Sequence, residues 1–309
     1  RTVKLVKEVM YLKKEFRSAG VDSLYMKPRI PLIILLFLSC HAQAQKLFTT
    51  VYAGISGYQG ELSTRPIDPV QSHPAFGIGL QYELNDHWLI RGDFTYGKIS
   101  GHDKYSLANR NRNLSFESNL SEFSLGIEYI PVNLYYYKVS PYAFAGIANF
   151  KFSPYTEARN GSRIVLSEFS TEGQGFYQDR QPYKLRQYSI PFGGGLFWAV
   201  SDNFRVGFVV GFRKTFTDYL DDVSTTYIDK DILAQNRGTN ALNYAFRANE
   251  LDPGLEYPAD GTVRGNPKTK DWYHFSGITV RFRITNFKDR QEQKRLRDRG
   301  RTDCPANRW

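Results

Sequence analysis

The chain has 309 residues, a formal net charge of +10 and a mean hydropathy of −0.47, and 15% of its residues are aromatic. It has no apolar run of the roughly 20 residues that a transmembrane helix needs, which excludes a helical membrane protein. Residues 1–44 hold eight basic and three acidic residues, and residues 287–309 hold eight basic and four acidic ones, so residues 45–286 carry only +1. Because the basic charge lies at the two ends, we expect no nucleic-acid partner.

The first 44 residues are typical of an export signal. Residues 26–44 combine a charged start, an apolar run and the cleavage pattern Ala42-Gln43-Ala44, which predicts a signal peptide and a mature chain from Gln45. Residues 1–25 are expected to be an upstream extension of the gene. Cys40 has two interpretations, a lipidated first residue or a cysteine discarded with the signal, and the cleavage pattern favours the second.

Apolar and polar residues then alternate in eight segments, which is typical of strands with one apolar face. The pattern is clearest over 76–84 and 88–96, on either side of Asn85-Asp86-His87. The predicted strands are 47–57, 74–84, 88–98, 120–130, 141–152, 184–200, 204–215 and 271–285.

Short and long connections follow one another in strict turn. Those near 85–87, 131–140 and 201–203 are short, and those near 58–73, 99–119, 153–183 and 216–270 are long. Outer-membrane barrels have short periplasmic turns and long extracellular loops. Residues 45–286 are therefore predicted to be all-β, an eight-stranded antiparallel transmembrane outer-membrane β-barrel in contact with lipid, in a Gram-negative bacterium.

The two faces of the predicted strands differ in chemistry. Aromatic residues are expected on the lipid face near both interfaces, at Trp88, Tyr142, Trp198, Phe204, Tyr96, Tyr188, Phe212 and Trp272. On the fifth strand this face is predicted to carry Tyr142, Phe144, Gly146, Ala148 and Phe150. The opposite face should form a lumen charge network of Glu83, Arg91, Asp93, Glu128, Arg205, Arg213, Arg281 and Arg283, with Glu122 and Lys151 on the same face. Eight strands leave room only for side chains, so we expect a filled lumen and no pore.

Two groups of residues are candidates for a catalytic or a metal site. His274 and Ser276 share one face of the eighth strand, as in a serine nucleophile with its base, but two polar residues near the interface are the favoured interpretation. Asp218, Asp221 and Asp222 could hold calcium, although EF-hand spacing is absent and a solvated or arginine-paired loop is favoured. We expect no catalytic residues, no metal and no cofactor.

The last segment, 287–309, is predicted to be a basic periplasmic tail. It carries Arg295, Arg297, Arg299, Arg301 and Cys304. One interpretation is a solvated tail. The other is a docking peptide that binds a periplasmic partner, with Cys304 as a candidate for a disulfide link because it is the single cysteine left after the signal.

Several short motifs then suggest a family. They are Pro74-Ala75-Phe76-Gly77, Thr95-Tyr96-Gly97-Lys98, Arg112-Asn113-Leu114-Ser115-Phe116, Ser140-Pro141-Tyr142-Ala143-Phe144-Ala145-Gly146, Thr171-Glu172-Gly173-Gln174-Gly175, Ser189-Ile190-Pro191-Phe192-Gly193, Asp271-Trp272-Tyr273 and, most specifically, the stretch 214–224. Together they resemble the PorG-like outer-membrane barrel family of Bacteroidetes-type bacteria over about 47–286, and Cys304-Pro305 is similar to the ending of that family.

The resemblance implies a non-enzymatic barrel of the type IX secretion machinery that anchors periplasmic ring subunits, including a lipoprotein. Two alternatives remain open, an outer-membrane lipid-modifying enzyme similar to a deacylase and a surface adhesion or binding barrel.

Overall fold

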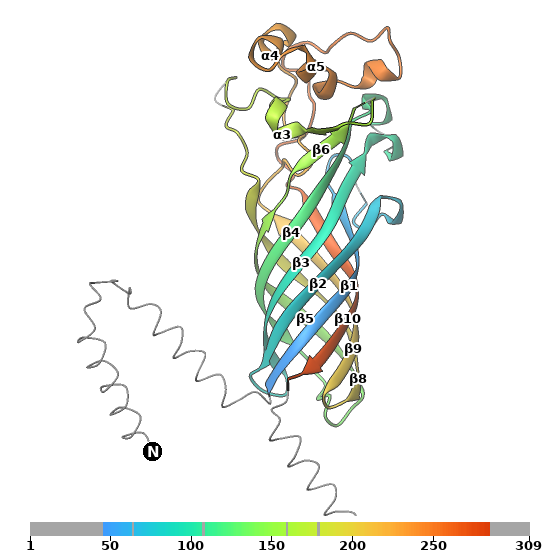
Figure 1. The fold of residues 1–309 in the computed structure, drawn as a ribbon, viewed down its shortest axis with the longest axis vertical. Coiled ribbons are helices and arrows are strands. Elements are labelled where there is room, and N and C mark those ends of the chain that lie inside the picture. Colours follow the sequence, from blue (N-terminus) through green and yellow to red (C-terminus); the bar gives the residue numbers. More distant parts are fainter. Residues whose placement is uncertain (1–45, 64, 107–108, 159, 178–179, 285–309) are drawn as a thin grey trace, which may run out of the picture. The chain divides into compact units, whose positions relative to one another are not determined.

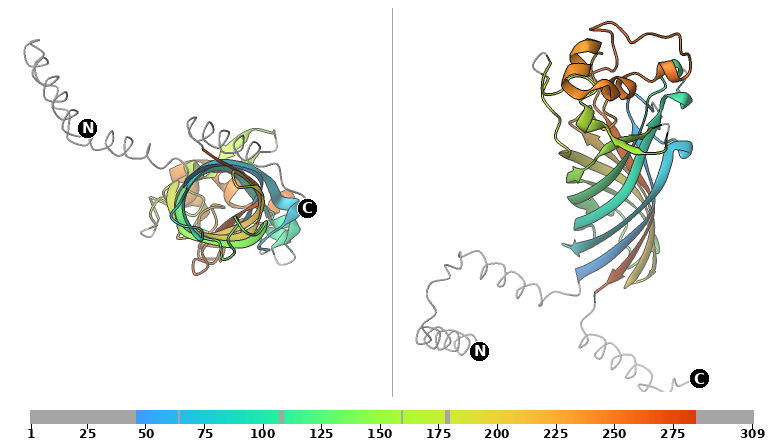
Figure 2. Two further views of the ribbon diagram at one scale, coloured as in Figure 1. Left: turned by 90° about the horizontal axis from the view of Figure 1, so that it is seen from below. Right: turned by 45° about the horizontal axis from the view of Figure 1, so that its top comes forward.

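The computed structural model describes residues 46–284 except 64, 107–108, 159 and 178–179, and within them eight strands close into an antiparallel barrel (Figures 1 and 2). The barrel strands are β1 (Leu47–Gln59), β2 (Ser72–Glu83), β3 (Trp88–His102), β4 (Ser115–Tyr129), β5 (Val139–Lys151), β8 (Arg186–Ser201), β9 (Phe204–Thr215) and β10 (Trp272–Arg283). They pair in the order β3-β2-β1-β10-β9-β8-β5-β4, and β3 pairs with β4 to close the ring. The predicted eight-stranded barrel is confirmed.

Alternating residues put apolar side chains outside and polar ones inside. On β2, Ile78 is 64% exposed on the outer surface, whereas Gln81 is buried inside the barrel. A belt of exposed apolar residues around a closed sheet is the arrangement of an outer-membrane barrel, because closure leaves no unpaired strand edge in lipid. None of the helices in the described part of the chain is long and apolar enough to cross a membrane.

The fifth strand corrects one prediction. Tyr142, Phe144 and Phe150 are buried inside the barrel and do not face lipid, whereas Lys151 is exposed. The lumen accepts these rings because its arginines stack on them, as Arg91 does on Phe144 at 4.3 Å. An alternation of aromatic and small residues therefore fixes the two faces of a strand but not which one turns inward.

Strands β3 and β4 extend furthest beyond their predicted bounds. The pairing of β3 with β4 continues to His102 and Ser115, several residues above the predicted segments. The apolar alternation fades there because the outward positions of both strands carry polar residues, among them Ser100 and His102 on β3 and Glu117 on β4. The strands thus continue beyond the part that their hydrophobic pattern reveals.

The two ends of the barrel differ sharply (Figure 1). At one end the connections 84–87, 130–138 and 202–203 are short, and the backbone N–H of Ile284 donates to the carbonyl of Leu47, which joins the first and last strands. We call these three connections the periplasmic base, because short connections are predicted to face the periplasm. The long connections 60–71, 103–114, 152–185 and 216–271 lie at the other end, and together we call them the cap.

The cap has secondary structure of its own. Besides the hairpin of β6 (Pro154–Glu157) and β7 (Arg163–Val165), it contains α3 (Leu166–Phe169), α4 (Lys230–Arg237), α5 (Thr239–Ala245), η2 (Pro69–Gln71), η3 (Asp103–Tyr105), η4 (Arg110–Arg112) and η5 (Ala248–Glu250). The prediction treated these regions only as loops. Helix α4 begins where the Asp229 carboxylate accepts from the N–H groups of Asp231 and Ile232, which is an ordinary N-cap.

Candidate functional site

Three groups of ion pairs cross the lumen, and the lowest closes the periplasmic base. Glu83 on β2 accepts from Arg205 on β9 at 2.8 Å and from Arg283 on β10 at 3.2 Å. The hydroxyl of Tyr135, from the turn between β4 and β5, donates to the same carboxylate at 2.6 Å. Because β2 and β9 are not neighbours in the sheet, this contact spans the interior.

The middle group is centred on Glu128 of β4. Arg281 of β10 donates to both of its oxygens at 2.7 Å, and Arg91 of β3 donates at 3.2 Å. Arg91 also pairs with Asp93 at 2.7 Å. Glu128 and Arg281 are almost completely buried, so each needs the other: a buried charge without its partner is strongly destabilising.

The upper group joins Glu122 on β4 to Arg213 on β9, with nitrogen–oxygen distances of 3.0–3.3 Å. The Tyr273 hydroxyl also donates to Glu122 at 2.6 Å. A cavity of about 40 Å³ between the upper and middle groups has room for only a few water molecules. Charged and aromatic side chains therefore fill the lumen, and the eight residues predicted for its charge network all lie in these three groups.

His274 and Ser276 lie on the outer face of β10. Neither ring nitrogen of His274 has a hydrogen-bond partner among the described residues, and neither does the Ser276 hydroxyl. In the register of the sheet, Gly57 and Phe212 flank His274, while Ile55 and Val210 flank Ser276. None of these neighbours is acidic, so the structure does not bring a serine, a base and an acid together at this place.

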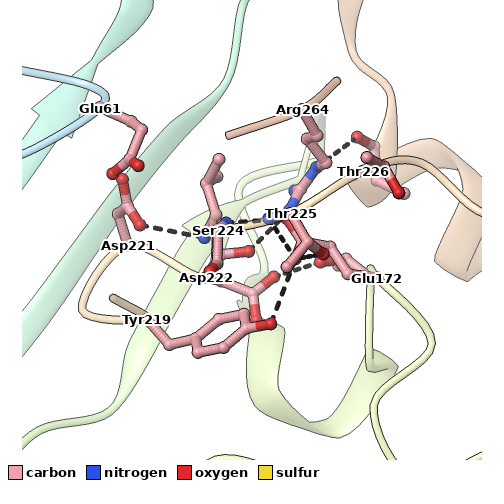
Figure 3. Close-up of polar contacts among 12 residues, drawn as sticks. Glu61, Glu172, Tyr219, Asp221, Asp222, Ser224, Thr225, Thr226 and Arg264 are labelled. Atoms are coloured by element: carbon pink, nitrogen blue, oxygen red, sulfur yellow. Dashed lines mark hydrogen bonds and ion pairs between the residues drawn. The ribbon is translucent and has the colours of Figure 1, made fainter. Parts of the chain in front are cut away.

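A buried ion pair organises the cap (Figure 3). Arg264 donates to Glu172 at 2.8 Å, and both side chains are at most 3% exposed. Glu172 also accepts from the N–H groups of Ser224 and Thr225 at 2.9 Å and from the Thr225 hydroxyl at 2.6 Å. This one carboxylate therefore ties segment 152–185 to segment 216–271.

The three aspartates predicted as a group turn in different directions. Asp222 accepts from Thr171 at 2.5 Å and from Tyr183 at 2.6 Å, and burial raises its pKa to about 6. Asp218 accepts from the Ser224 hydroxyl at 2.7 Å, and burial raises its pKa to about 6. Asp221 points away from both, toward two carboxylates that the sequence had not suggested.

Those partners are Glu61 and Asp271, and with Asp221 they form what we call the carboxylate cluster. One oxygen from each lies within 4.8 Å of the others, and Figure 3 shows Glu61 and Asp221 facing one another. Burial raises the pKa of Glu61 to about 7, with a further contribution from the charge of Asp218. Burial, followed by the neighbouring carboxylates, raises the pKa values of Asp221 and Asp271 well above the usual range.

A signal for the cluster was present in the sequence. The first and last strands of a closed barrel are neighbours, and here Gln59 pairs with Trp272. Residues just beyond those two ends, Glu61 and Asp271, must therefore lie close together. The pairing of Glu172 with Arg264 carried no comparable signal, because both residues belong to irregular segments.

Several predicted features lie outside the described residues. They are the extension 1–25, the signal peptide 26–44 with Cys40, and the tail 287–309 with Arg295, Arg297, Arg299, Arg301 and Cys304. These remain expectations from the sequence.

Comparison with solved structures finds similar eight-stranded barrels. The attachment invasion locus protein Ail of Yersinia pestis shares 13% identity, with a TM-score of 0.36, over 77% of this chain and 98% of that chain. Neisserial surface protein A shares 11% identity, with a TM-score of 0.39, over 77% of this chain and 96% of that chain. The outer membrane protein OprG from Pseudomonas aeruginosa shares 9% identity, with a TM-score of 0.36, over 77% and 97%.

No curated protein matches the sequence. One family profile does, over residues 27–241, which is more than half of the chain. The chain belongs to the family described as domain of unknown function DUF6089.

Proposed function

We propose that this protein is a non-enzymatic barrel in the outer membrane of a Gram-negative bacterium, which anchors periplasmic ring subunits of the type IX secretion machinery. The resemblance of its motifs to the PorG-like family suggests the machinery. The observation that carries the anchoring role is the way in which the base of the barrel is built. The filled lumen argues against a passage for proteins or solutes through the barrel itself.

One turn of the periplasmic base is fixed from inside and exposed outside. Leu134 is buried, and Tyr135 donates to Glu83 in the lumen, so the start of the turn is held rigidly. The next two residues project outward: Tyr136 is 83% exposed and Tyr137 is 65% exposed. Rigid, exposed tyrosines are favourable protein contacts because they bury a large area at a small cost in conformational entropy.

Co-purification from native membranes tests the proposal. The full-length barrel, extracted in mild detergent, should co-elute with a lipoprotein and further periplasmic subunits, identified by mass spectrometry. The double variant Tyr136→Ser/Tyr137→Ser should lose them, while Tyr105→Ser in the cap should keep them. Heat-modifiable migration on gels checks that each barrel is folded. Failure of any periplasmic protein to co-elute with the folded barrel would overturn the anchoring role.

Two strain phenotypes test the finer parts of the proposal. A deletion strain should lose secretion of type IX cargo, and normal secretion would reject that assignment. If the basic tail forms a covalent link, non-reducing gels should show a thiol-sensitive adduct that Cys304→Ser removes. The lipid A acyl pattern should not change on deletion, because His274 has no acid beside it; a changed pattern would favour the deacylase-like alternative.

A second candidate function is surface binding, favoured by a cavity of about 360 Å³ on the cap. Its lining includes Glu157, Asn160, Ser162, Asn243, Tyr244 and Asn249. Amides beside an aromatic ring suit a polyhydroxylated ligand such as a glycan. Binding of purified barrel to a glycan array that Asn243→Ala abolishes would support this role, and binding unchanged by Asn243→Ala would place the glycan elsewhere.

A further inference from the structure

The carboxylate cluster concentrates negative charge where water is largely excluded. Asp221 and Asp271 are at most 1% exposed, and Glu61 is half-buried beside them. The backbone N–H groups of Val223, Leu220 and Asn266 each donate to one of the three carboxylates. Neutral donors of this kind reduce the cost of burying charge but do not balance it.

The cluster has too few hydrogen atoms for its carboxylate oxygens, so it needs an added positive charge. The Tyr58 hydroxyl lies 2.6 Å from Asp221 Oδ2 and 3.0 Å from Asp271 Oδ1. It has a single hydrogen, so it can donate fully to only one of two acceptors. The cluster is therefore short of at least one proton or one cation.

The nearby arginines are already committed to other acids. Arg112 donates to both oxygens of Asp103 at 2.7 and 2.8 Å, and Arg264 pairs with Glu172. Among the described residues, no salt bridge joins a lysine or arginine to Glu61, Asp221 or Asp271. Arg112 acts on Glu61 and Asp221, and Lys270 on Asp218, without forming a salt bridge, so a counter-charge in direct contact with the cluster would come from outside the described chain.

A fourth carboxylate supplies an independent observation. Asp218 is 2% exposed, and its Oδ1 atom has no hydrogen-bond partner among the described residues. Asp218 follows Thr217, whose carbonyl accepts from the backbone N–H of Asp271 at 3.1 Å, so it lies beside the cluster, and its charge disfavours ionisation of Glu61 and Asp271. A buried carboxylate oxygen without a donor is rarely left so in a stable protein, unless an ion or a water molecule satisfies it.

The size and chemistry of the cluster fit calcium. Ca²⁺ binds oxygen ligands at about 2.3–2.6 Å, so opposite ligands lie up to about 5 Å apart. The three carboxylate oxygens within 4.8 Å of one another match that span. All donors are oxygens, as a hard cation prefers, and loop carbonyls and water could complete the shell.

We propose that Glu61, Asp221 and Asp271 form a binding site for one Ca²⁺ ion, with the unpaired oxygen of Asp218 beside it. The ion joins segment 60–71 to segment 216–271 directly above the seam between β1 and β10. Gly60 permits this approach because a Cβ atom there would collide with Asp271 and Tyr58. The bound Ca²⁺ thus holds the two segments together at the cap end of the barrel. This role is independent of the function proposed for the base.

Calorimetry on the folded, full-length barrel in detergent, stripped with EDTA and dialysed, tests the site. Titration with CaCl₂ at pH 7.5 should give one binding event per chain. Asp271→Asn and Glu61→Gln should each weaken it at least tenfold, whereas Asp252→Asn, an exposed aspartate of the same segment, should leave it unchanged. Glu61 is half-buried, so its variant serves as the test if Asp271→Asn does not fold.

Limited proteolysis gives a second measurement on the same samples. CaCl₂ at 1 mM should slow cleavage within 216–271 in the wild type but not in Glu61→Gln, and MgCl₂ should protect less. The proposal is overturned if 1 mM CaCl₂ neither binds nor protects, or if both cluster variants bind as the wild type does. Protection that instead depends only on pH, with no effect of CaCl₂, would mean that the cluster holds protons and not a cation.

Discussion

The lumen and the cap both bury many charges, but they balance them differently. In the lumen each acidic group described above has an arginine partner, as Glu128 has Arg281 and Glu83 has Arg205. In the cap, Glu172 is paired in the same way with Arg264, whereas Glu61, Asp221 and Asp271 meet one another. The acidic groups of the lumen are therefore neutralised by arginines of the barrel itself, whereas we expect part of the cap to depend on pH or on a bound cation.

This contrast has consequences for stability. Lumen pairs link strands across the barrel, so their loss should affect the whole fold. Cap contacts link segments to one another above the rim, so their loss should open the cap locally while the barrel remains closed. The predictions below test that division, beginning with the largest expected effect.

Removing the partner of a central lumen charge should destabilise the whole barrel. Arg281→Met leaves Glu128 with Arg91 alone, and we expect a loss of about 3–5 kcal/mol in the free energy of unfolding. Urea unfolding of the barrel in lipid vesicles measures it. The matched control is Arg186→Met at an exposed site of the rim. The double variant Glu128→Met/Arg281→Met should recover most of the loss, and failure to recover would mean that packing and not charge dominates here.

Removing the partner of the central cap charge should instead act locally. Arg264→Met leaves Glu172 buried without its cation, so segment 216–271 should open with a cost of about 3 kcal/mol. Cleavage in this segment should become much faster, while the barrel keeps its heat-modifiable migration. Lys268→Met, an exposed change in the same segment, is the control. Global unfolding of Arg264→Met would refute the division between the two regions.

The lumen was largely predictable and the cap was not, for a physical reason. Along a strand, alternation assigns Glu83 and Arg205 to the interior without knowledge of their partners, because every second residue faces the same side. Strand β5 is the exception. Both of its faces are apolar, so the alternation does not show which face turns toward lipid, and the sequence wrongly predicts that Tyr142 does. In the cap no period exists, so nothing relates Glu172 to Arg264 until the chain has folded.

Closure of the barrel is a partial exception that sequence reasoning could use. Because β1 and β10 must be neighbours, the residues after the first strand and before the last one meet, which brings Glu61 to Asp271. Asp221 joins them from the middle of a long connection, and only the structure reveals it. The sequence favours a solvated or arginine-paired loop for Asp218, Asp221 and Asp222, but all three are buried, and only Asp221 belongs to the carboxylate cluster.

The cap should also respond to pH when no calcium is present. Burial raises the pKa of Asp222 to about 6 from 3.8, so the folded cap holds this proton more tightly than the unfolded chain does. Stability from this proton is complete below about pH 4 and is lost as the pH rises through 6, by on the order of 2–3 kcal/mol. In EDTA, cleavage within 216–271 should thus be slower at pH 4.5 than at pH 7.5. Asp222→Asn should reduce this difference, and an unchanged difference would assign the effect to other groups.

The smallest effect is expected where the lumen meets the periplasmic base. Tyr135→Phe removes the hydrogen bond to Glu83 and the one that its hydroxyl accepts from Arg283. Glu83 keeps both of its arginines, so the loss should be only about 1–2 kcal/mol. Tyr105→Phe, at a half-exposed position of the cap, should change neither stability nor partner binding and serves as the control. The informative measurement compares the loss in the free energy of unfolding with the loss of partner co-purification. If Tyr135→Phe weakens co-purification more than its small loss of stability can explain, the lumen acts on the base by holding the turn in its binding conformation. If co-purification falls only in proportion to stability, or if neither of them changes, the turn needs no such support. The filled lumen then contributes only to the stability of the barrel.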